Sequence, residues 1–185
     1  MLGPTGHIDT FTRDRLPPAE EWPEMPLDGF QYPEFLNAAV ELTDRMVEKG
    51  FGDHTALIGN GRSRTYKELT DWSNRIAHAL VEDYGVKPGN RVLIRSANNP
   101  AMVACWLAAT KAGPVVVNTM PMLRAGELGQ IVDRGDLCVG IAGQRHQIDQ
   151  RVDIVVDFVL QIHHLGDRIL HGVRIRRRSF GCAGQ

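Results

Sequence analysis

The sequence predicts an α/β fold in which parallel strands alternate with helices. Three short apolar runs, at 91–95, 115–118 and 137–141, each have the length of a buried strand. Two segments of helical length, at 100–112 and 125–133, separate them. This alternation is typical of parallel strands joined by crossover helices, so we expect one sheet with helices packed on it.

The chain before this pattern is expected to hold an arm and a first helix. Residues 1–33 are rich in Pro, Glu and Asp and show no helical period, which favours an extended arm on a surface or a frayed terminus. A helix is predicted over 34–49, because Pro33 stands where a helix begins and Gly50 where one ends. Its apolar stripe is expected to consist of Phe35, Ala39, Leu42 and Met46.

A β-hairpin and a second helix are predicted next. Asn60-Gly61 separates two extended runs, 55–59 and 62–66, which is a strong hairpin signal. Thr65 and Glu68 have the spacing of a capping box, so a helix is expected to follow and to run to about Asp83. The apolar stripe of that helix is Leu69, Trp72, Ile76 and Leu80.

The central helix of the predicted βαβ pattern has clear signals at both ends. Asn98 or Asn99 is its N-cap, Pro100 is its first residue and Gly113 is its C-cap. The residues between are apolar on nearly every side, so this helix is expected to be buried. After 137–141 the pattern weakens, because Val152–Leu160 has strand propensity but also fits a helix.

Composition excludes several classes of protein. The chain has 185 residues, of which 43% are hydrophobic and 23% charged, with a net charge of −1. These values predict one globular domain, or one with a small extension, and no global attraction to nucleic acid or to an anionic membrane. With no apolar run of about 18 residues and no signal-peptide core, a cytoplasmic location is expected. The cysteines, which lack zinc spacing, are expected to be reduced: Cys105, Cys138 and Cys182.

An abrupt change of composition occurs near Gly135. Residues 1–134 carry 14 basic and 17 acidic side chains, whereas residues 135–185 carry 7 and 5 and contain no Lys, Glu or Pro. We therefore divide the chain into the arm 1–33, a partial domain 34–134 and a divergent, irregular tail 135–185. One hypothesis for the tail is a change of reading frame in a GC-rich gene, and the alternative is a genuine divergent segment.

Four stretches resemble the adenylate-forming, AMP-dependent acyl-CoA synthetases, and in particular the benzoate and 2-aminobenzoate CoA ligases. Their order and spacing match the opening part of that family, from Leu16 to about Arg134. They are the Leu16-Pro-Pro arm leading to Tyr32-Pro-Glu-Phe-Leu-Asn37, the Thr65-Tyr-Lys-Glu-Leu69 motif, the Gly85–Ile94 segment and the Asn99–Val117 segment, followed by Pro121 and Glu127-Leu128.

The resemblance implies a two-step reaction and an incomplete N-terminal subdomain of the adenylate-forming ligase fold. In the family, a carboxylate attacks ATP to form an acyl-adenylate, and coenzyme A then displaces AMP, with Mg as a further requirement. The family's phosphate loop, ribose-binding acid and C-terminal lysine have no counterpart in these 185 residues. We therefore assign no catalytic, cofactor-binding or metal-binding residue, and we expect the chain alone to be inactive.

Several single features allow a functional and a structural interpretation. Gly59-Asn60-Gly61 superficially resembles a nucleotide-binding turn, but its place between two extended runs favours a hairpin. His163, His164 and His171 could bind a metal, but no carboxylate or cysteine completes a known spacing. The basic run Arg174–Arg178 could contact nucleic acid, but a solvated tail is favoured.

Structural roles are also favoured for four residues of the domain. Ser96 has no acid–base partner and is interpreted as a hydroxyl at the end of a strand. Met102 and Trp106 lie on a helix that backs the acyl pocket in the resembled family, but core packing is the favoured role. Lys111 is expected to complement the dipole of its helix.

Three hypotheses of function follow. The first is a truncated CoA ligase, inactive alone. The second is a non-catalytic module that binds an acyl-CoA, an adenylate or a full-length ligase, and the third is a nucleic-acid-binding protein that uses the basic run. If the partner surface of the subdomain is missing, apolar faces such as Val115–Val117 are expected to be exposed and the chain marginally stable.

Overall fold

A computed structural model describes residues 5–24, 26, 29–142 and 155–156. Its elements, in the order of the chain, confirm the predicted α/β class. They are α1 (Phe11–Asp14), the short helical turn η1 (Ala19–Glu21), α2 (Ala38–Leu42), α3 (Asp44–Met46), the turn η2 (Val47–Phe51), β1 (Thr55–Gly59), β2 (Arg62–Thr65), α4 (Tyr66–Glu82), β3 (Arg91–Arg95), α5 (Pro100–Ala112), β4 (Val115–Thr119), α6 (Ala125–Gly135), β5 (Val139–Ala142) and β6 (Val155–Val156).

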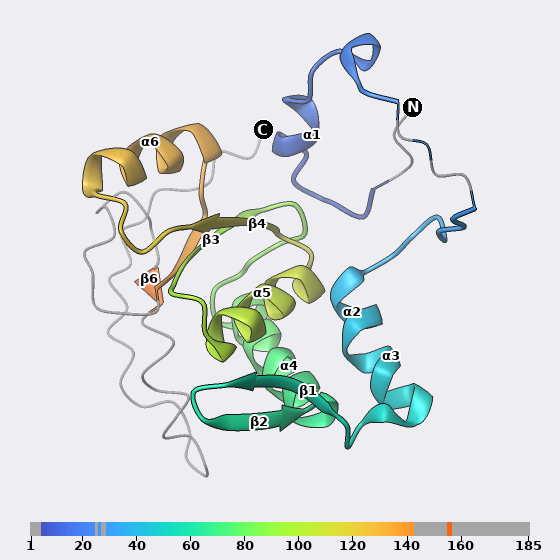
Figure 1. Cartoon of the computed structure of the whole chain (residues 1–185). Helices are drawn as coiled ribbons and strands as arrows, with labels where there is room; N and C mark the ends of the chain where they lie inside the picture. Colours follow the sequence, from blue (N-terminus) through green and yellow to red (C-terminus); the bar gives the residue numbers. More distant parts are fainter. Residues whose placement is uncertain (1–4, 25, 27–28, 143–154, 157–185) are drawn as a thin grey trace.

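The larger sheet has the strand order β4-β3-β5-β6, and all its pairs are parallel. Its central strand, β3, is buried at every residue, as expected for a parallel strand covered on both faces. Figure 1 shows α6 on one side of this sheet and α4 and α5 on the other. The edge strand β4 keeps Val115–Val117 half-buried, so the exposure expected there is only partial.

Two apolar clusters hold the layers together. The larger lies between the sheet and the pair α4 and α5, and includes Trp72, Ile76, Leu107, Val92 and Ile94. The smaller lies on the α6 side, where Leu93 packs with Val132 and Leu137. Because neighbouring residues of a strand point to opposite faces, β3 contributes to both clusters in alternation.

The hairpin and α4 form as predicted. Asn60 and Gly61 both have positive φ, at 53° and 71°, which is the conformation that a tight two-residue hairpin requires. The side chain of Thr65 accepts a hydrogen bond from the backbone of Glu68, and the Glu68 carboxylate accepts one from the Thr65 N–H. This capping box starts α4, and the predicted apolar stripe is its buried face.

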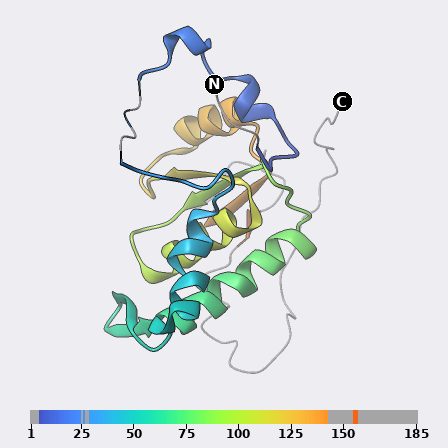
Figure 2. The same cartoon turned by 90° about the vertical axis from the view of Figure 1, so that its right-hand side faces the viewer.

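Helix α5 also has its predicted ends. Asn99 Oδ1 accepts the N–H of Met102 at 2.9 Å, Pro100 is the first residue of the helix, and Gly113 ends it with φ of 92°. Figure 2 shows α5 between α4 and the sheet, which explains why its sequence is apolar on nearly every side.

The helix predicted over 34–49 is wrong in its start and in its continuity. It begins only at Ala38, because Asn37 Oδ1 accepts the N–H groups of Ala39 and Val40 and so acts as the N-cap. It is interrupted at Thr43, whose hydroxyl donates to Ala39 O at 2.6 Å, a type of contact that bends helices. Of the expected stripe, Ala39 is buried, whereas Phe35 and Leu42 are exposed.

The arm and the predicted tail both differ from their predicted structures. Residues 5–22 contain two short helical turns rather than a fully extended arm, and they contact the end of the sheet at which β3 begins. Strand β5 lies within the predicted tail 135–185, so the sheet extends beyond Arg134. Of Val152–Leu160, only β6 is described, and the rest lies outside the described residues.

No helix in the described portion is long and apolar enough to cross a membrane.

Candidate functional site

The edge of the sheet at which the strands end is the candidate site. Strands β3, β4 and β5 end side by side at Arg95, Thr119 and Ala142. The chain leaves β3 toward β4 on one side and leaves β5 toward β6 on the other. In open parallel α/β sheets, ligands bind outside the carboxyl ends of the strands at such a reversal of direction.

Two polar side chains are buried at this edge. Arg95 is 8% exposed and Thr119 is 9% exposed, and they are register partners on adjacent strands. One guanidinium nitrogen of Arg95, Nη2, donates to the carbonyls of Pro121 and Leu123, and thereby fixes the loop between β4 and α6. Arg95 Nε and Thr119 Oγ1 are both buried without a hydrogen-bond partner in the described structure.

Ser96 and Asn99 follow β3 at the same edge. The Ser96 hydroxyl donates to Ala97 O at 3.1 Å and accepts the side-chain amide of Asn99 at 3.3 Å. Asn99 in turn caps α5. The structure therefore places Ser96 in the turn before a helix, as expected of a hydroxyl at a strand end, and within the described residues it contacts Ala97 and Asn99.

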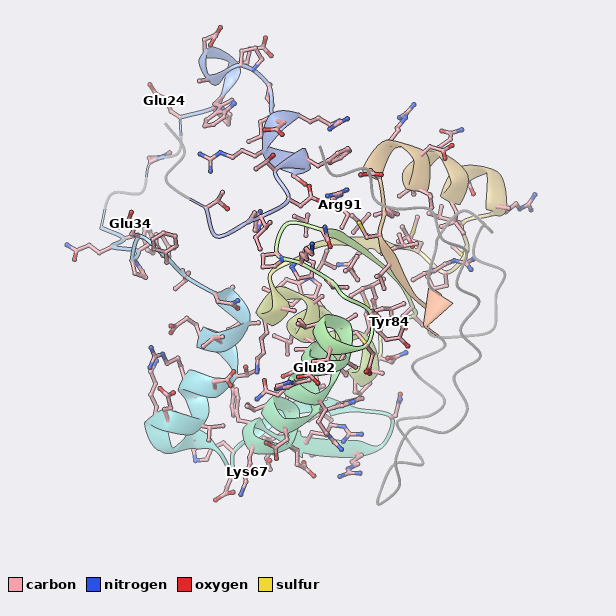
Figure 3. All side chains as sticks on the ribbon, turned by 180° about the vertical axis from the view of Figure 1, so that it is seen from behind. Glu24, Glu34, Lys67, Glu82, Tyr84 and Arg91 are labelled. Atoms are coloured by element: carbon pink, nitrogen blue, oxygen red, sulfur yellow. The ribbon has the colours of Figure 1, made fainter. Side chains whose placement is uncertain are left out.

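The opposite edge of the sheet has a buried arginine with many partners. Arg91, at the start of β3, is 3% exposed and forms ion pairs with Asp9 and Asp136. It also donates to the carbonyls of Gly89, Gly135 and Asp136, and its guanidinium lies 4.3 Å from the ring centre of Phe11. Figure 3 shows Arg91 between α1 and α6. This cluster joins the arm, the sheet and α6.

Asp9 is held in its charged form by this contact. Burial acts to raise the pKa of Asp9, but hydrogen bonds from the Phe11 N–H, Arg91 and Asn90 outweigh it and hold the pKa below its usual range. The backbone beside it approaches closely, since a Cβ placed on Gly89 would lie 2.1 Å from Asp9 O. Gly89 also has φ of 89°, so glycine is required there on two grounds.

Lys111 lies in a buried polar network near the end of α5. Its ammonium contacts the Asp44 carboxylate at 2.5 Å and Asn74 Oδ1 at 2.7 Å. Burial acts to raise the pKa of Asp44, but the hydrogen bonds from Lys111 and Thr43 lower it by more. The pKa of Asp44 therefore lies below its usual value. Lys111 therefore links α5 to α3 and α4, a role that was not predicted from the sequence beside its helix-dipole role.

The remaining predicted features fall in the core, in a turn or outside the described residues. Met102 and Trp106 are half-buried and pack against the larger apolar cluster. Gly59-Asn60-Gly61 forms the hairpin turn. Cys105 is buried, and burial raises the pKa of its thiol to about 12, which keeps it protonated and unreactive.

Two sets of predicted residues, the histidines 163, 164 and 171 and the basic run 174–178, lie outside the described portion of the chain. Within the described portion, no group of three His, Cys, Asp or Glu side chains is placed to hold a metal ion.

Arg95 and Thr119 are not among the candidate residues predicted from the sequence. A signal was present, because β3 reads Arg-Val-Leu-Ile-Arg and carries a charge at each end of an apolar run. A charged residue that ends a buried strand faces either solvent or a partner. Which of the two applies depends on residues far away in the sequence, so the pattern alone does not decide it.

Curated relatives give the family context. The chain is 39% identical to 3-hydroxybenzoate–CoA/4-hydroxybenzoate–CoA ligase of Thauera aromatica over 82 residues, which is 44% of this chain and 16% of that protein. It is 31% identical over 105 residues to a medium/long-chain-fatty-acid–CoA/3-oxocholest-4-en-26-oate–CoA ligase of Mycobacterium tuberculosis, covering 57% of this chain and 19% of the relative. The chain therefore matches less than a fifth of the length of these proteins.

Solved structures agree on the fold. The N-terminal subdomain of Klebsiella oxytoca NpsA aligns with a TM-score of 0.58 and 23% identity over 65% of this chain and 31% of that one. A benzoate CoA ligase from Burkholderia xenovorans LB400 aligns with a TM-score of 0.53 and 28% identity over 58% of this chain and 22% of that one.

The family model described as AMP-binding enzyme matches residues 44–170. This match covers more than half of the chain and continues past Arg134, where the sequence resemblance was expected to stop. The protein therefore belongs to the AMP-binding enzyme family, the family of the AMP-dependent acyl- and aryl-CoA ligases.

Proposed function

We propose that this chain is the opening portion of an aryl-CoA ligase, an enzyme that activates a carboxylic acid with ATP and transfers it to CoA. The observation that carries the proposal is the 39% identity to hydroxybenzoate–CoA ligases over 82 residues. The benzoate CoA ligase among the solved structures supports the same class of acid. Benzoate, a hydroxybenzoate or 2-aminobenzoate is the proposed substrate of the complete enzyme.

A fatty or steroid acid is the competing substrate class. The relatives with those names are matched over more residues, 105 against 82, but at lower identity, 31% against 39%. We favour the aromatic acid because its relatives have the higher identity and because a benzoate CoA ligase is among the solved structures that share the fold. A cytoplasmic location, where ATP and CoA are available, belongs to the same proposal.

We further propose that the 185 residues do not catalyse adenylation by themselves. The sequence has no Ser/Thr/Gly-rich phosphate loop that ends in Lys, and transition states with charge on phosphate need such preorganised donors. Among the described residues, no group of His, Cys, Asp or Glu side chains is placed to hold a magnesium ion.

A change of reading frame remains the proposed origin of the tail. The family match that continues to residue 170 and the pairing of β5 with β3 favour a change later in the chain than Gly135. Sequencing the gene beyond codon 130 and translating all three frames tests this. A phosphate loop in another frame is expected, and a family-like continuation in no frame would contradict the proposal.

ATP–pyrophosphate exchange tests the activity. The purified chain is expected to show no exchange with benzoate, 3-hydroxybenzoate or 2-aminobenzoate. Replacing the matching segment of a benzoate CoA ligase with residues 5–142 is expected to retain exchange with aromatic acids. Exchange by the isolated chain would contradict its inactivity, and a chimera that prefers a fatty acid would contradict the aromatic assignment.

A non-catalytic partner-binding module is the second candidate. It is favoured by the exposure of large apolar side chains beside α2, namely Phe30, Tyr32, Phe35, Leu36 and Leu42. Calorimetric titration with benzoyl-CoA and with a full-length aryl-CoA ligase tests it. The absence of heat in both titrations would exclude it.

A further inference from the structure

Arg95 is a buried cation with no carboxylate partner in the described structure. An arginine side chain is always charged at ordinary pH, and a buried charge is costly unless an opposite charge or several hydrogen bonds compensate it. The carbonyls of Pro121 and Leu123 accept from Nη2 and offset part of the charge. The Nε–H group, however, is buried and has no acceptor among the described residues.

Thr119 presents a second free donor at the same place. It pairs with Arg95 across adjacent parallel strands, which are about 4.7–4.9 Å apart. By alternation both side chains lie on the face of Leu93 and Val117, the face that α6 covers. The Thr119 hydroxyl is buried and has no hydrogen-bond partner within the part of the chain that the structure describes.

We propose that Arg95 and Thr119 form a binding site for an oxyanion, either a carboxylate or a phosphate group, at the carboxyl edge of β3 and β4. One oxygen of the anion accepts the Nε–H of Arg95 and another accepts the hydroxyl hydrogen of Thr119. The site depends on these two residues and on their position in the sheet, and it does not require that the complete protein be a CoA ligase.

Charge distinguishes an anion from a water molecule as the occupant. A water molecule would satisfy both hydrogen-bonding groups but would leave the guanidinium charge uncompensated. Glu127, the acidic residue that follows this loop, accepts the Arg124 N–H at 2.8 Å and is not an ion-pair partner of Arg95 in the described structure. An oxyanion supplies both the acceptors and the charge.

The loop over the site provides the route of entry. Its residues Met120 and Met122 are 60% and 83% exposed, so displacing them breaks little packing. When the site is empty, the hydrogen bonds from Arg95 to the carbonyls of Pro121 and Leu123 hold the loop against the end of β3. An arriving anion competes for the same guanidinium, so binding and loop movement are coupled.

Arginine side-chain NMR signals of the 15N-labelled 185-residue chain test the proposal. Benzoate and inorganic phosphate are titrated separately at low ionic strength. The Nε–H signal of Arg95, identified by its loss in Arg95→Lys, is expected to shift to saturation with at least one anion. The Nε–H signal of Arg91 is the internal control, because that group donates to Gly135 O and is expected not to move.

Two valine variants make the test specific. Thr119→Val removes the proposed hydrogen bond and is expected to raise the apparent dissociation constant of the anion about tenfold. Thr70→Val removes another buried, unpartnered hydroxyl, in α4 on the opposite face of the sheet, and is expected to change nothing. An Arg95 signal that ignores both anions, equal shifts of Arg91 and Arg95, or equal affinities of the two valine variants would each overturn the proposal.

Discussion

The two ends of strand β3 carry the same residue in opposite situations. Arg91 and Arg95 are both buried, and both point to the α6 side of the sheet. Arg91 has two carboxylate partners, three carbonyl acceptors and an aromatic ring. Arg95 has two carbonyl acceptors, and in the described structure no carboxylate contacts it.

This difference separates a structural use of arginine from a candidate functional one. At the edge where the strands begin, the arm, the end of α6 and the turn before β3 supply the partners, so the charge holds these segments together. At the edge where they end, the described structure leaves the Nε–H of Arg95 and the hydroxyl of Thr119 without acceptors, in the region where parallel sheets bind ligands. Burial alone therefore does not show what an arginine does, whereas a count of its acceptors does.

The largest effect is expected from Arg91→Met. Removing the guanidinium leaves Asp9 without its cation and separates the arm from α6, so the free energy of unfolding should fall by about 3–5 kcal/mol. Urea denaturation followed by tryptophan fluorescence measures it. A loss below about 1 kcal/mol would show that the cluster is a surface contact rather than a structural link.

The contact between Gly89 and Asp9 gives the next largest effect. Gly89→Ala adds both a clash with Asp9 O and strain at φ of 89°, and should cost about 2–4 kcal/mol. Gly61→Ala is the matched control, because Gly61 has φ of 71° and no atom within 4 Å of an added Cβ. That variant should lower the free energy of unfolding by about 1 kcal/mol. Equal losses for the two variants would show that Asp9 is not in close contact with Gly89.

Lowering the pH should destabilise the fold by protonating Asp9, which contacts Arg91 at the start of β3. Its folded-state pKa lies below the ordinary value of 3.8, so ionised Asp9 stabilises the fold above that value. This stabilisation is lost as the pH falls through the folded-state pKa. Urea midpoints measured between pH 6 and pH 3 should therefore fall more for the wild type than for Asp9→Asn. The exposed variant Asp14→Asn should follow the wild type, and parallel curves for all three would refute the assignment.

The smallest effect is expected from Arg95→Met in the absence of any anion. The variant loses two hydrogen bonds to loop carbonyls but also removes an uncompensated buried charge, so its stability should lie within about 1 kcal/mol of the wild type. Urea denaturation in anion-poor buffer measures it. A loss as large as that of Arg91→Met would mean that the two ends of β3 are equivalent.

Local signals in the sequence predicted most of the fold. Thr65 with Glu68, Asn99 with Pro100, and Asn60-Gly61 each act within a few residues, and each appears in the structure where it was expected. The bend at Thr43 was missed, because its hydroxyl chooses between solvent and a backbone carbonyl only when the helix is packed.

The candidate site could not be predicted because its character depends on distant partners. Arg91 and Arg95 look alike in the sequence. Asp9 lies 82 residues from Arg91, and Asp136 lies 45 residues beyond it. Only the folded chain shows that one arginine receives these carboxylates and that the other does not.

The Arg91 cluster also sets an order of events during synthesis on the ribosome. Asp9 and Arg91 are made first, and Asp136 follows 45 residues after Arg91. At about 5–20 residues per second this interval is roughly 2–9 s. During it the nascent arm has a cation to contact, but the second carboxylate does not yet exist. The cluster is therefore complete only after Asp136 has been made, and a chain stalled before residue 136 lacks one of the two carboxylates that contact Arg91.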